Sequence, residues 1–463
     1  MSKAKKLYIL LGIWVTFSTL TFMISRLEVQ KEQIKMTGKV ILDISNDTVT
    51  ALSWKTDNQS LTFQKKDGAW YYTEDKNFPV NAEKIAELLE QFQEFGASFV
   101  IENATDYKQY GLDKPTCTIH ITAGEKSHEI QLGAFSKMDS QRYVSIGDGC
   151  VYLVKHDPLK SFSQKLSDLI QHDQLPSFAE VKTIKFAGKE NYRINFERDS
   201  KQTYCADDLY FADGKPLDTA AVKRYLNNIS GLSLSDYASY YVSDLELKQF
   251  GLDQPELAVT VNFKKTDKKE GEHETFVIQI GRNQEELAAA KQSGKENAED
   301  SVTAYIRVGN SQIVYRIAAK SYKALMAASY TELRHKEVLT ASFEDIDRIS
   351  ISLEGNDYTF TSKGRGNDKA WYYKEDEKLN IDSFQSALSG LKAESFTSEG
   401  PTQKEEIGLT VYLNNAYHQE VSIRLYRYDG NNCLAVIDGT SSSLLPRSSV
   451  VDLIEAVNKI VLA

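Results

Sequence analysis

The chain has 463 residues and a formal net charge of -10, from 55 lysines and arginines against 65 aspartates and glutamates. This length is too great for one core, and at roughly 100–200 residues per domain it predicts about three domains. The acidic balance argues against a nucleic-acid partner, because nucleic acids are bound by basic faces.

An apolar segment without any charged side chain occupies residues 7–24. As a helix it would span about 27 Å, just enough to cross the hydrocarbon core of a bilayer. Three lysines in residues 1–6 precede it, and residues 25–39 after it carry mixed charges. This asymmetry predicts a single-pass transmembrane anchor with residues 1–6 in the cytoplasm, residues 25–39 as a stalk and the body outside. A cleaved signal peptide is the alternative.

The first predicted module covers residues 40–172. An Asp67-Gly68 hairpin turn leads into the aromatic triplet Trp70-Tyr71-Tyr72. An N-cap at Asn81, a preceding apolar staple residue and a stripe with helical spacing predict a helix over residues 81–95 that packs on a sheet. The stripe is Ile85, Leu88, Leu89 and Phe92.

A Gly-Leu-Asp-x-Pro element follows this helix at Tyr110-Gly111-Leu112-Asp113-Lys114-Pro115. Because proline cannot continue a strand ladder, the element predicts a turn that feeds a strand. That strand, which starts near Cys117, alternates apolar and polar residues and returns through a hairpin at Gly124. A further hairpin, from residues 143–146 to residues 151–153, completes the module.

The second predicted module covers residues 177–334 and repeats these features in the same order. It has the aromatic cluster Leu209-Tyr210-Phe211, a helix predicted over residues 218–229 and the turn Phe250-Gly251-Leu252-Asp253-Gln254-Pro255. Two charged insertions, residues 264–274 and 284–300, interrupt its hairpins. We expect both to be solvent-exposed loops.

The third predicted module, residues 341–463, is a divergent copy. It retains the triplet Trp371-Tyr372-Tyr373 and a helix predicted over residues 380–391, with Asn380 as the N-cap. Ile407-Gly408-Leu409-Thr410 keeps the Gly-Leu pair and loses the Asp and the Pro. The predicted fold is therefore α+β, with tandem repeated modules behind a single N-terminal transmembrane helix. Each module is a mostly antiparallel sheet with one packed helix.

The recurring polar and aromatic residues have structural interpretations. Asp113 and Asp253 stand at equivalent turn positions in separate modules, so neither provides an acid–base partner for the other. We expect each to hold its turn through side-chain-to-backbone hydrogen bonds. The aromatic clusters are interpreted as a sheet face beneath the helix, with a ligand platform as the alternative.

The remaining candidates for chemistry are weak. The seven histidines show no metal-binding spacing, and His120 is expected to face Glu129 across an exposed hairpin. Ser389-Gly390-Leu391-Lys392 matches the S-x-x-K motif of penicillin-recognising enzymes, but it stands at the end of a helix and lacks the companion motifs. We predict no catalytic, cofactor-binding or metal-binding residues, no cofactor and no enzymatic activity.

The four cysteines do not recur between copies, so they are not a disulfide framework, although a bridge between Cys117 and Cys150 is left open. They are Cys117, Cys150, Cys205 and Cys433.

The order of these landmarks resembles the bacterial domain-of-unknown-function family 4340. The landmarks are Trp70, Tyr110 to Pro115, Tyr143, Phe250 to Pro255 and Tyr305. The resemblance covers nearly all of residues 40–340, and more weakly the remainder. Members of that family look like single-pass or lipid-anchored envelope proteins, often encoded beside ABC-type transport systems of the gliding-motility auxiliary type. The resemblance implies an accessory role to such a transporter and brings no catalytic residues.

Two functional hypotheses follow. The leading one is a non-catalytic, membrane-anchored extracytoplasmic accessory protein that contacts ABC-type permease or auxiliary subunits or the cell envelope. The alternative is an extracytoplasmic module that binds envelope glycans or a small ligand through exposed tyrosines. An envelope hydrolase is a third possibility.

Overall fold

The computed structural model describes residues 39–102, 104–264, 273–374 and 377–462. The predicted cytoplasmic segment 1–6, the predicted anchor 7–24 and the predicted stalk up to residue 38 lie outside these ranges. Within the described ranges, none of the helices combines the length and the apolar character needed to span a membrane.

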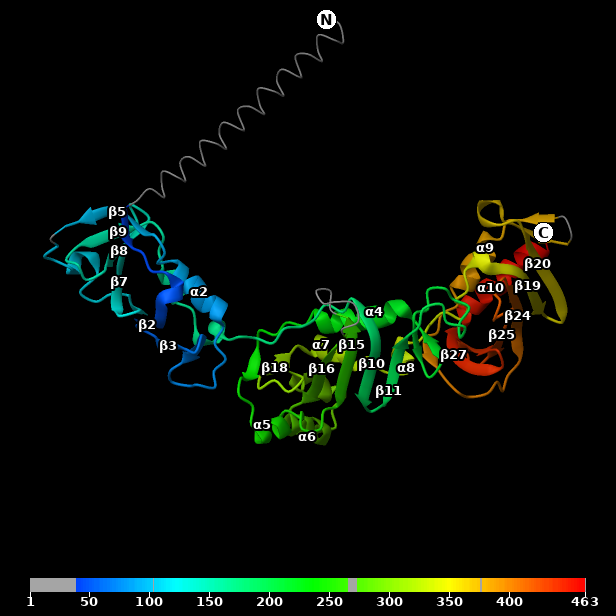
Figure 1. The fold of residues 1–463 in the computed structure, drawn as a ribbon. Coiled ribbons are helices and arrows are strands. Elements are labelled where there is room, and N and C mark those ends of the chain that lie inside the picture. Colours follow the sequence, from blue (N-terminus) through cyan, green and yellow to red (C-terminus); the bar gives the residue numbers. More distant parts are fainter. Residues whose placement is uncertain (1–38, 103, 265–272, 375–376, 463) are drawn as a thin grey trace, which may run out of the picture. The chain divides into compact units, whose positions relative to one another are not determined.

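The chain divides into two compact units, Met1–His172 and Asp173–Ala463. In the described residues the first unit holds one nine-stranded sheet and the second holds two, and every pairing within these sheets is antiparallel (Figure 1). We call each sheet with its helices a module. The α+β class and the repeated antiparallel modules are thus confirmed.

The strands of the first module run in the spatial order β1-β5-β9-β8-β7-β6-β2-β3-β4. Their bounds are β1 (Lys39–Leu42), β2 (Val49–Thr56), β3 (Ser60–Lys66), β4 (Ala69–Tyr72), β5 (Phe95–Ile101), β6 (Cys117–Ala123), β7 (Lys126–Ser136), β8 (Gln141–Ser145) and β9 (Val151–Val154).

The second module follows the order β13-β12-β11-β10-β15-β16-β17-β18-β14. Its strands are β10 (Glu180–Gly188), β11 (Tyr192–Phe196), β12 (Tyr210–Ala212), β13 (Lys215–Leu217), β14 (Tyr237–Ser239), β15 (Leu257–Lys264), β16 (His273–Arg282), β17 (Ala304–Val308) and β18 (Val314–Ile317).

The third module follows the order β22-β21-β20-β19-β24-β25-β26-β27-β23. Its strands are β19 (Ile346–Leu353), β20 (Asn356–Lys363), β21 (Ala370–Tyr373), β22 (Glu377–Leu379), β23 (Ser395–Phe396), β24 (Glu405–Leu413), β25 (Glu420–Arg427), β26 (Asn432–Ile437) and β27 (Thr440–Pro446).

Eight strands occupy the same positions in all three sheets when each is traced from β5, β14 or β23. The first sheet adds β1 beyond β5, whereas the second and third add β13 and β22 at the opposite edge. The third module therefore keeps the complete strand order despite its divergent sequence.

Each module places its predicted helix in the chain between two strands of its sheet. These helices are α2 (Ala82–Glu90), α4 (Thr219–Ser230) and α9 (Asp382–Ser389). Asn81 and Asp218 cap the first two by accepting hydrogen bonds from the Lys84 and Ala220 amides. The predicted apolar stripes are buried, as Ile85, Val222 and Phe384 illustrate with no exposed surface.

Two helix boundaries differ from prediction. The first helix was expected to reach residue 95, but it ends at Glu90 because Glu94 adopts a left-handed backbone (φ 48°) and Phe95 begins β5. In the third module the N-cap is Ile381, and Asn380 instead accepts a hydrogen bond from the Asp382 amide at 3.0 Å.

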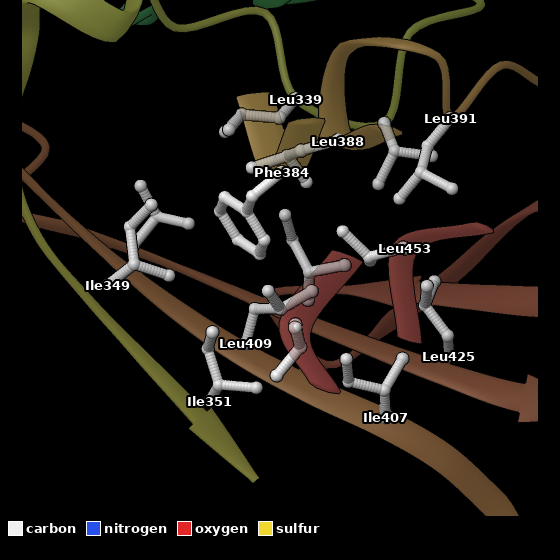
Figure 2. Close-up of a cluster of buried hydrophobic side chains, with 14 of the residues drawn as sticks. Leu339, Ile349, Ile351, Phe384, Leu388, Leu391, Ile407, Leu409, Leu425 and Leu453 are labelled. Atoms are coloured by element: carbon white, nitrogen blue, oxygen red, sulfur yellow. The ribbon is translucent and has the colours of Figure 1, made fainter. Parts of the chain in front are cut away.

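The prediction of one packed helix per module is wrong for the second and third modules. There α7 (Ala319–Met326) contacts α4, and α10 (Arg447–Val461) contacts α9. Figure 2 shows how Phe384 and Leu388 from α9 meet Leu453 from α10 above sheet residues such as Leu409 and Leu425. In the first module the corresponding segment is the single turn α3 (Leu159–Phe162), whose Phe162 ring lies 5.3 Å from that of Trp54.

The second charged insertion is also not a loop. Residues 284–300 contain α6 (Gln284–Ser293), capped by Asn283, and most of its side chains are exposed apart from Leu287. A run of good helix formers explains this outcome, since Ala, Glu, Gln and Lys make up most of α6. Most of the other insertion, residues 265–272, lies outside the described residues.

Candidate interaction surface

The Gly-Leu turn of the first module is held by close backbone packing. Gly111 has a left-handed conformation (φ 65°), and Leu112 beside it is buried. A side chain at Gly133 would place its Cβ 2.3 Å from the Tyr110 carbonyl oxygen, so β7 must carry glycine there. The Tyr110 ring packs 5.0 Å from the Tyr143 ring on β8. The motif in this module is thus a close approach of β7 to the backbone of the turn, secured by an aromatic pair.

The second module repeats this arrangement. Gly251 is left-handed (φ 67°), and a Cβ at Gly281 on β16 would lie 2.4 Å from the Gly251 carbonyl oxygen. Phe250 and Tyr305 form the aromatic pair, with ring centroids 4.4 Å apart. The same packing of a glycine-bearing strand against the turn, with an aromatic pair beside it, therefore occurs in both modules.

The two motif aspartates do not have the predicted role. Asp113 and Asp253 are exposed, and within the described residues neither carboxylate accepts a hydrogen bond. Left-handed glycine rather than an aspartate side chain makes the turn, because glycine adopts positive φ without a steric penalty.

The third module lacks the turn, and the proposed match at residues 407–410 is wrong. Gly408 lies inside β24, where it pairs with Ser352 and Arg424. Its position corresponds to the strand that follows the turn in the other modules. The Gly-Leu pair at residues 408–409 belongs to a strand of alternating residues and not to a turn of the repeated motif.

An ion pair between an arginine and a carboxylate lies near each Gly-Leu turn. Arg142 is 7% exposed, lies 2.6 Å from the Asp157 carboxylate and also donates to the Gly133 carbonyl. In the second module the Arg282 Nε lies 2.8 Å from the Glu256 carboxylate. Tyr322 donates to the same carboxylate at 2.7 Å, and burial together with this hydrogen bond raises the pKa of Tyr322. These carboxylates are engaged in structural pairs.

The other residues considered for chemistry are dispersed. His120 faces Glu129 at 3.8 Å as predicted, with both side chains about half exposed. Ser389 is exposed at the end of α9, whereas Lys392 pairs with Glu337 at 3.1 Å. No group of three or more histidine, cysteine or acidic side chains suited to a metal ion occurs in the part of the chain that the structure describes.

All four cysteines are free thiols, so the bridge left open between Cys117 and Cys150 is not formed. Burial raises the pKa of the Cys117 thiol to about 12, and that of Cys433 to about 11. Burial with the nearby Asp208 charge raises the pKa of Cys205 to about 11. These three thiols stay protonated at neutral pH and are poor nucleophiles.

The aromatic clusters divide between core and surface. Tyr72, Phe211 and Trp371 are buried, which confirms the sheet-face interpretation for them, whereas Tyr71 is 40% exposed. Strand alternation explains the difference, because neighbouring residues on β4 point to opposite faces.

An apolar surface borders the Gly-Leu turn of the second module. The short helix α5 (Asp244–Gln249) carries Leu245 with 77% of its surface exposed, and Tyr241 before it is 55% exposed. Leu247 on the same helix instead packs toward Phe250 and the buried cluster behind the turn. We call the outward residues Tyr241, Asp244, Leu245 and Asp253 the α5 surface.

The α5 surface has a well-defined scaffold. Ser243 and Glu246 form a reciprocal capping box, in which each side chain accepts a hydrogen bond from the other residue's amide. Hydrogen bonding from Ser243 lowers the pKa of Glu246, so this cap keeps its charge. α5 contacts α6, and Figure 1 shows both helices at the end of the second module away from α4. Sequence reasoning missed this surface because Leu245 and Leu247 both look like core residues.

A cleft of about 560 Å³ lies elsewhere on the second module. Hydroxyl side chains line much of it, together with Arg316, which pairs with Asp236 at 2.9 Å. The hydroxyl residues are Ser233, Ser235, Ser301, Thr303 and Ser321.

The described architecture defines a tandem-repeat α+β protein with three related antiparallel modules. The chain belongs to the family of the domain of unknown function DUF4340, whose model matches residues 70–246 and 216–411. The matches begin in β4 and β13, just before a helix, and end in α5 and β24 of the following module. The family unit is thus out of phase with the structural modules. A comparison with curated proteins found no match, and neither did a comparison with solved structures.

Proposed function

We propose that this protein is a non-catalytic, membrane-anchored extracytoplasmic accessory protein that contacts subunits of an ABC-type transport system. The uncharged segment 7–24 and the lysines before it support the anchor and its orientation. The proposed localisation is the cell membrane, with the N-terminus inside and the modules outside. The accessory role follows the expectation raised by the family resemblance.

The α5 surface is the observation that carries this proposal. Leu245 on α5 is 77% exposed and Tyr241, four residues earlier in the chain, is 55% exposed, so this segment presents apolar side chains to solvent. The repeated motif behind it is used for packing, so the motif supports a surface and not a reaction centre. An apolar anchor within a polar rim is the usual composition of a protein interface.

The test is the recovery of membrane subunits with the full chain. A photo-crosslinker at position 245 should capture a permease or auxiliary subunit in intact cells, whereas one at Met138, 93% exposed in the first module, should not. Leu245→Asp should reduce co-purification by about tenfold, the factor for one lost apolar anchor. Gln249→Asp adds the same charge to an exposed site on the same helix and should have little effect.

Two outcomes would contradict this proposal. The first is that the chain purifies without any membrane subunit and that Leu245→Asp makes no difference. This result would remove the support for the proposal. Loss of cellular function on replacing Asp113 or Asp253 in a normally folded protein would favour an enzyme.

A second candidate is an extracytoplasmic glycan-binding or small-ligand-binding module. The hydroxyl-lined cleft of about 560 Å³ favours it, since such side chains can exchange hydrogen bonds with sugar hydroxyls. Titration with soluble cell-wall fragments, compared between the natural chain and Ser301→Trp, would distinguish this candidate. Binding that the substitution abolishes would support it.

A further inference from the structure

The connection between β11 and β12 is much longer than its counterparts. It covers residues 197–209, whereas in the first module the Asp67-Gly68 turn alone joins β3 to β4. The corresponding connection in the third module covers residues 364–369. The sheet itself does not require this extra length, since the two-residue turn makes the same hairpin.

The additional residues reach the third module. Tyr204 packs against the buried core cluster of that module, and its ring lies 5.9 Å from the ring of His418. The His418 Nε2 in turn lies 3.1 Å from the Lys201 carbonyl oxygen. Burial raises the pKa of Tyr204, so this anchor is uncharged. Loop 197–209 therefore ties the second module to the third.

A buried carboxylate connects this loop to the segment between the modules. Asp208 is 3% exposed, accepts a hydrogen bond from the Thr203 hydroxyl at 2.6 Å and lies 2.7 Å from His335 Nε2. His335 belongs to residues 334–340, which lead into the third module. Two backbone hydrogen bonds join this segment to the end of α9, from Val338 to Leu391 at 3.0 Å and from Ala393 to Lys336 at 2.7 Å.

Three carboxylates surround His335, and each lies on a different part of the chain. Asp208 is on loop 197–209, Asp218 caps α4 and Glu337 lies 4.0 Å from His335 Nδ1 on the same segment. Two of these carboxylates have other cationic partners. Arg224 lies 3.5 Å from Asp218, and Lys392 lies 3.1 Å from Glu337. Asp208 lacks such a cation among the described residues, so it depends on His335.

Protonation of His335 is linked to the folded arrangement. Burial lowers the pKa of His335, but the hydrogen bond and charge of Asp208, with Asp218 and Glu337, outweigh burial and raise it. A raised pKa means that the stabilisation is complete below the unfolded pKa of about 6.5 and is lost as pH rises through the folded pKa. Above it, the buried Asp208 carboxylate faces a neutral ring.

We propose that the Asp208–His335 pair is a pH-sensitive clasp that couples the second and third modules and loosens as the medium becomes alkaline. Removing the positive partner of a buried carboxylate is costly, because the charge remains without compensation. Opening of loop 197–209 and segment 334–340 relieves this cost by exposing Asp208 to water. The clasp thus makes the coupling between the two modules depend on the pH of the surrounding medium.

Hydrogen exchange of the full chain in detergent tests the clasp. Exchange is measured at pH steps from about 6 to 9, around the ordinary histidine pKa, and is corrected for the intrinsic rate. Peptides from residues 197–209 and 334–340 should lose about fivefold in protection as pH rises, the factor of one ordinary hydrogen bond. Peptides from β6 and β7 should not change.

His335→Gln keeps a donor to Asp208 but cannot titrate, so its protection in these segments should not vary with pH. His120→Gln is the matched control, since its half-exposed pair with Glu129 at 3.8 Å resembles the clasp only in composition. The control should retain the pH profile of the natural chain. A pH-independent natural chain, or a profile that survives His335→Gln, would overturn the proposal.

Discussion

At the residue scale, glycine positions rather than acidic side chains explain the repeated motif. Gly111 and Gly251 make the left-handed turns, while Gly133 and Gly281 let a strand approach the turn backbone. Asp113 and Asp253 are exposed and take no part in this packing.

Gly133→Ala should therefore destabilise the first unit by about 1–3 kcal/mol or more, the usual cost of overpacking. The reason is the 2.3 Å approach of the new Cβ to the Tyr110 carbonyl oxygen. Urea unfolding of the full chain measures the change. Gly400→Ala is the control, since a Cβ there meets no atom within 4 Å. Equal unfolding midpoints for the two variants would contradict the proposed contact.

At the element scale, local sequence periodicity determines the helices, whereas tertiary packing determines which strands lie at the edges of each sheet. The stripe on α4 is buried as expected, with Leu226 at 4% and Ile229 at 0% exposure. The second helix of the second and third modules was missed, because α7 and α10 come after the last predicted hairpin. The apolar faces of α7 and α10 have a surface to pack on only because the first helix leaves part of the sheet uncovered.

Leu226→Ala should cost about 2–5 kcal/mol, because it empties a buried position between α4 and the sheet. Lys223→Ala on the exposed face of the same helix should cost little. Chemical denaturation of both variants, followed by far-ultraviolet circular dichroism, gives the comparison. A small effect of Leu226→Ala would mean that α4 does not pack as described.

The loop between β11 and β12 can be tested as an element. Replacing residues 197–209 by Asp-Gly, the turn of the first module, should leave the hairpin intact and remove Tyr204 and Asp208. Limited trypsin digestion should then cleave faster after Arg334 and Lys336, since the segment loses its contacts. The cleavage rate in residues 137–142 of the first module is the internal control. An unchanged rate at residues 334–336 would show that the loop does not secure the junction.

At the scale of the whole molecule, two compact units divide the chain at His172 and Asp173. The second unit contains two modules joined by loop 197–209, whereas the first module has a two-residue turn at the equivalent place. Contacts of loop 197–209 and of segment 334–340 join the two modules of this unit.

The predicted topology has a direct test. Cysteine introduced at Ala289, which is exposed on α6, should react in intact cells with a thiol reagent that cannot cross the membrane. The natural chain is the control for its own four cysteines. Labelling at position 289 that requires cell lysis would place the modules in the cytoplasm.

The sequence by itself determined the α+β class, the repetition and the main helices. Periodicity, caps and turn residues act over a few positions, so residues such as Asn81, Ile85 and Gly124 carry their information locally. The same local signals predicted the alternating strand from Cys117 and its hairpin partner. These signals failed at residues 407–410, where the predicted turn is a strand, and at residues 284–300, where the predicted loop contains a helix. In both places the same local pattern is compatible with more than one structure.

Only the tertiary structure decided the nine-strand order, the second helices, the α5 surface and the module junction. Asp208 and His335 are separated by 127 positions, and no local pattern relates them. The same holds for β5 beside β9, or for Tyr204 against the core of the third module. Such contacts depend on which surfaces remain uncovered once the local elements have formed, and that is a property of the assembled chain.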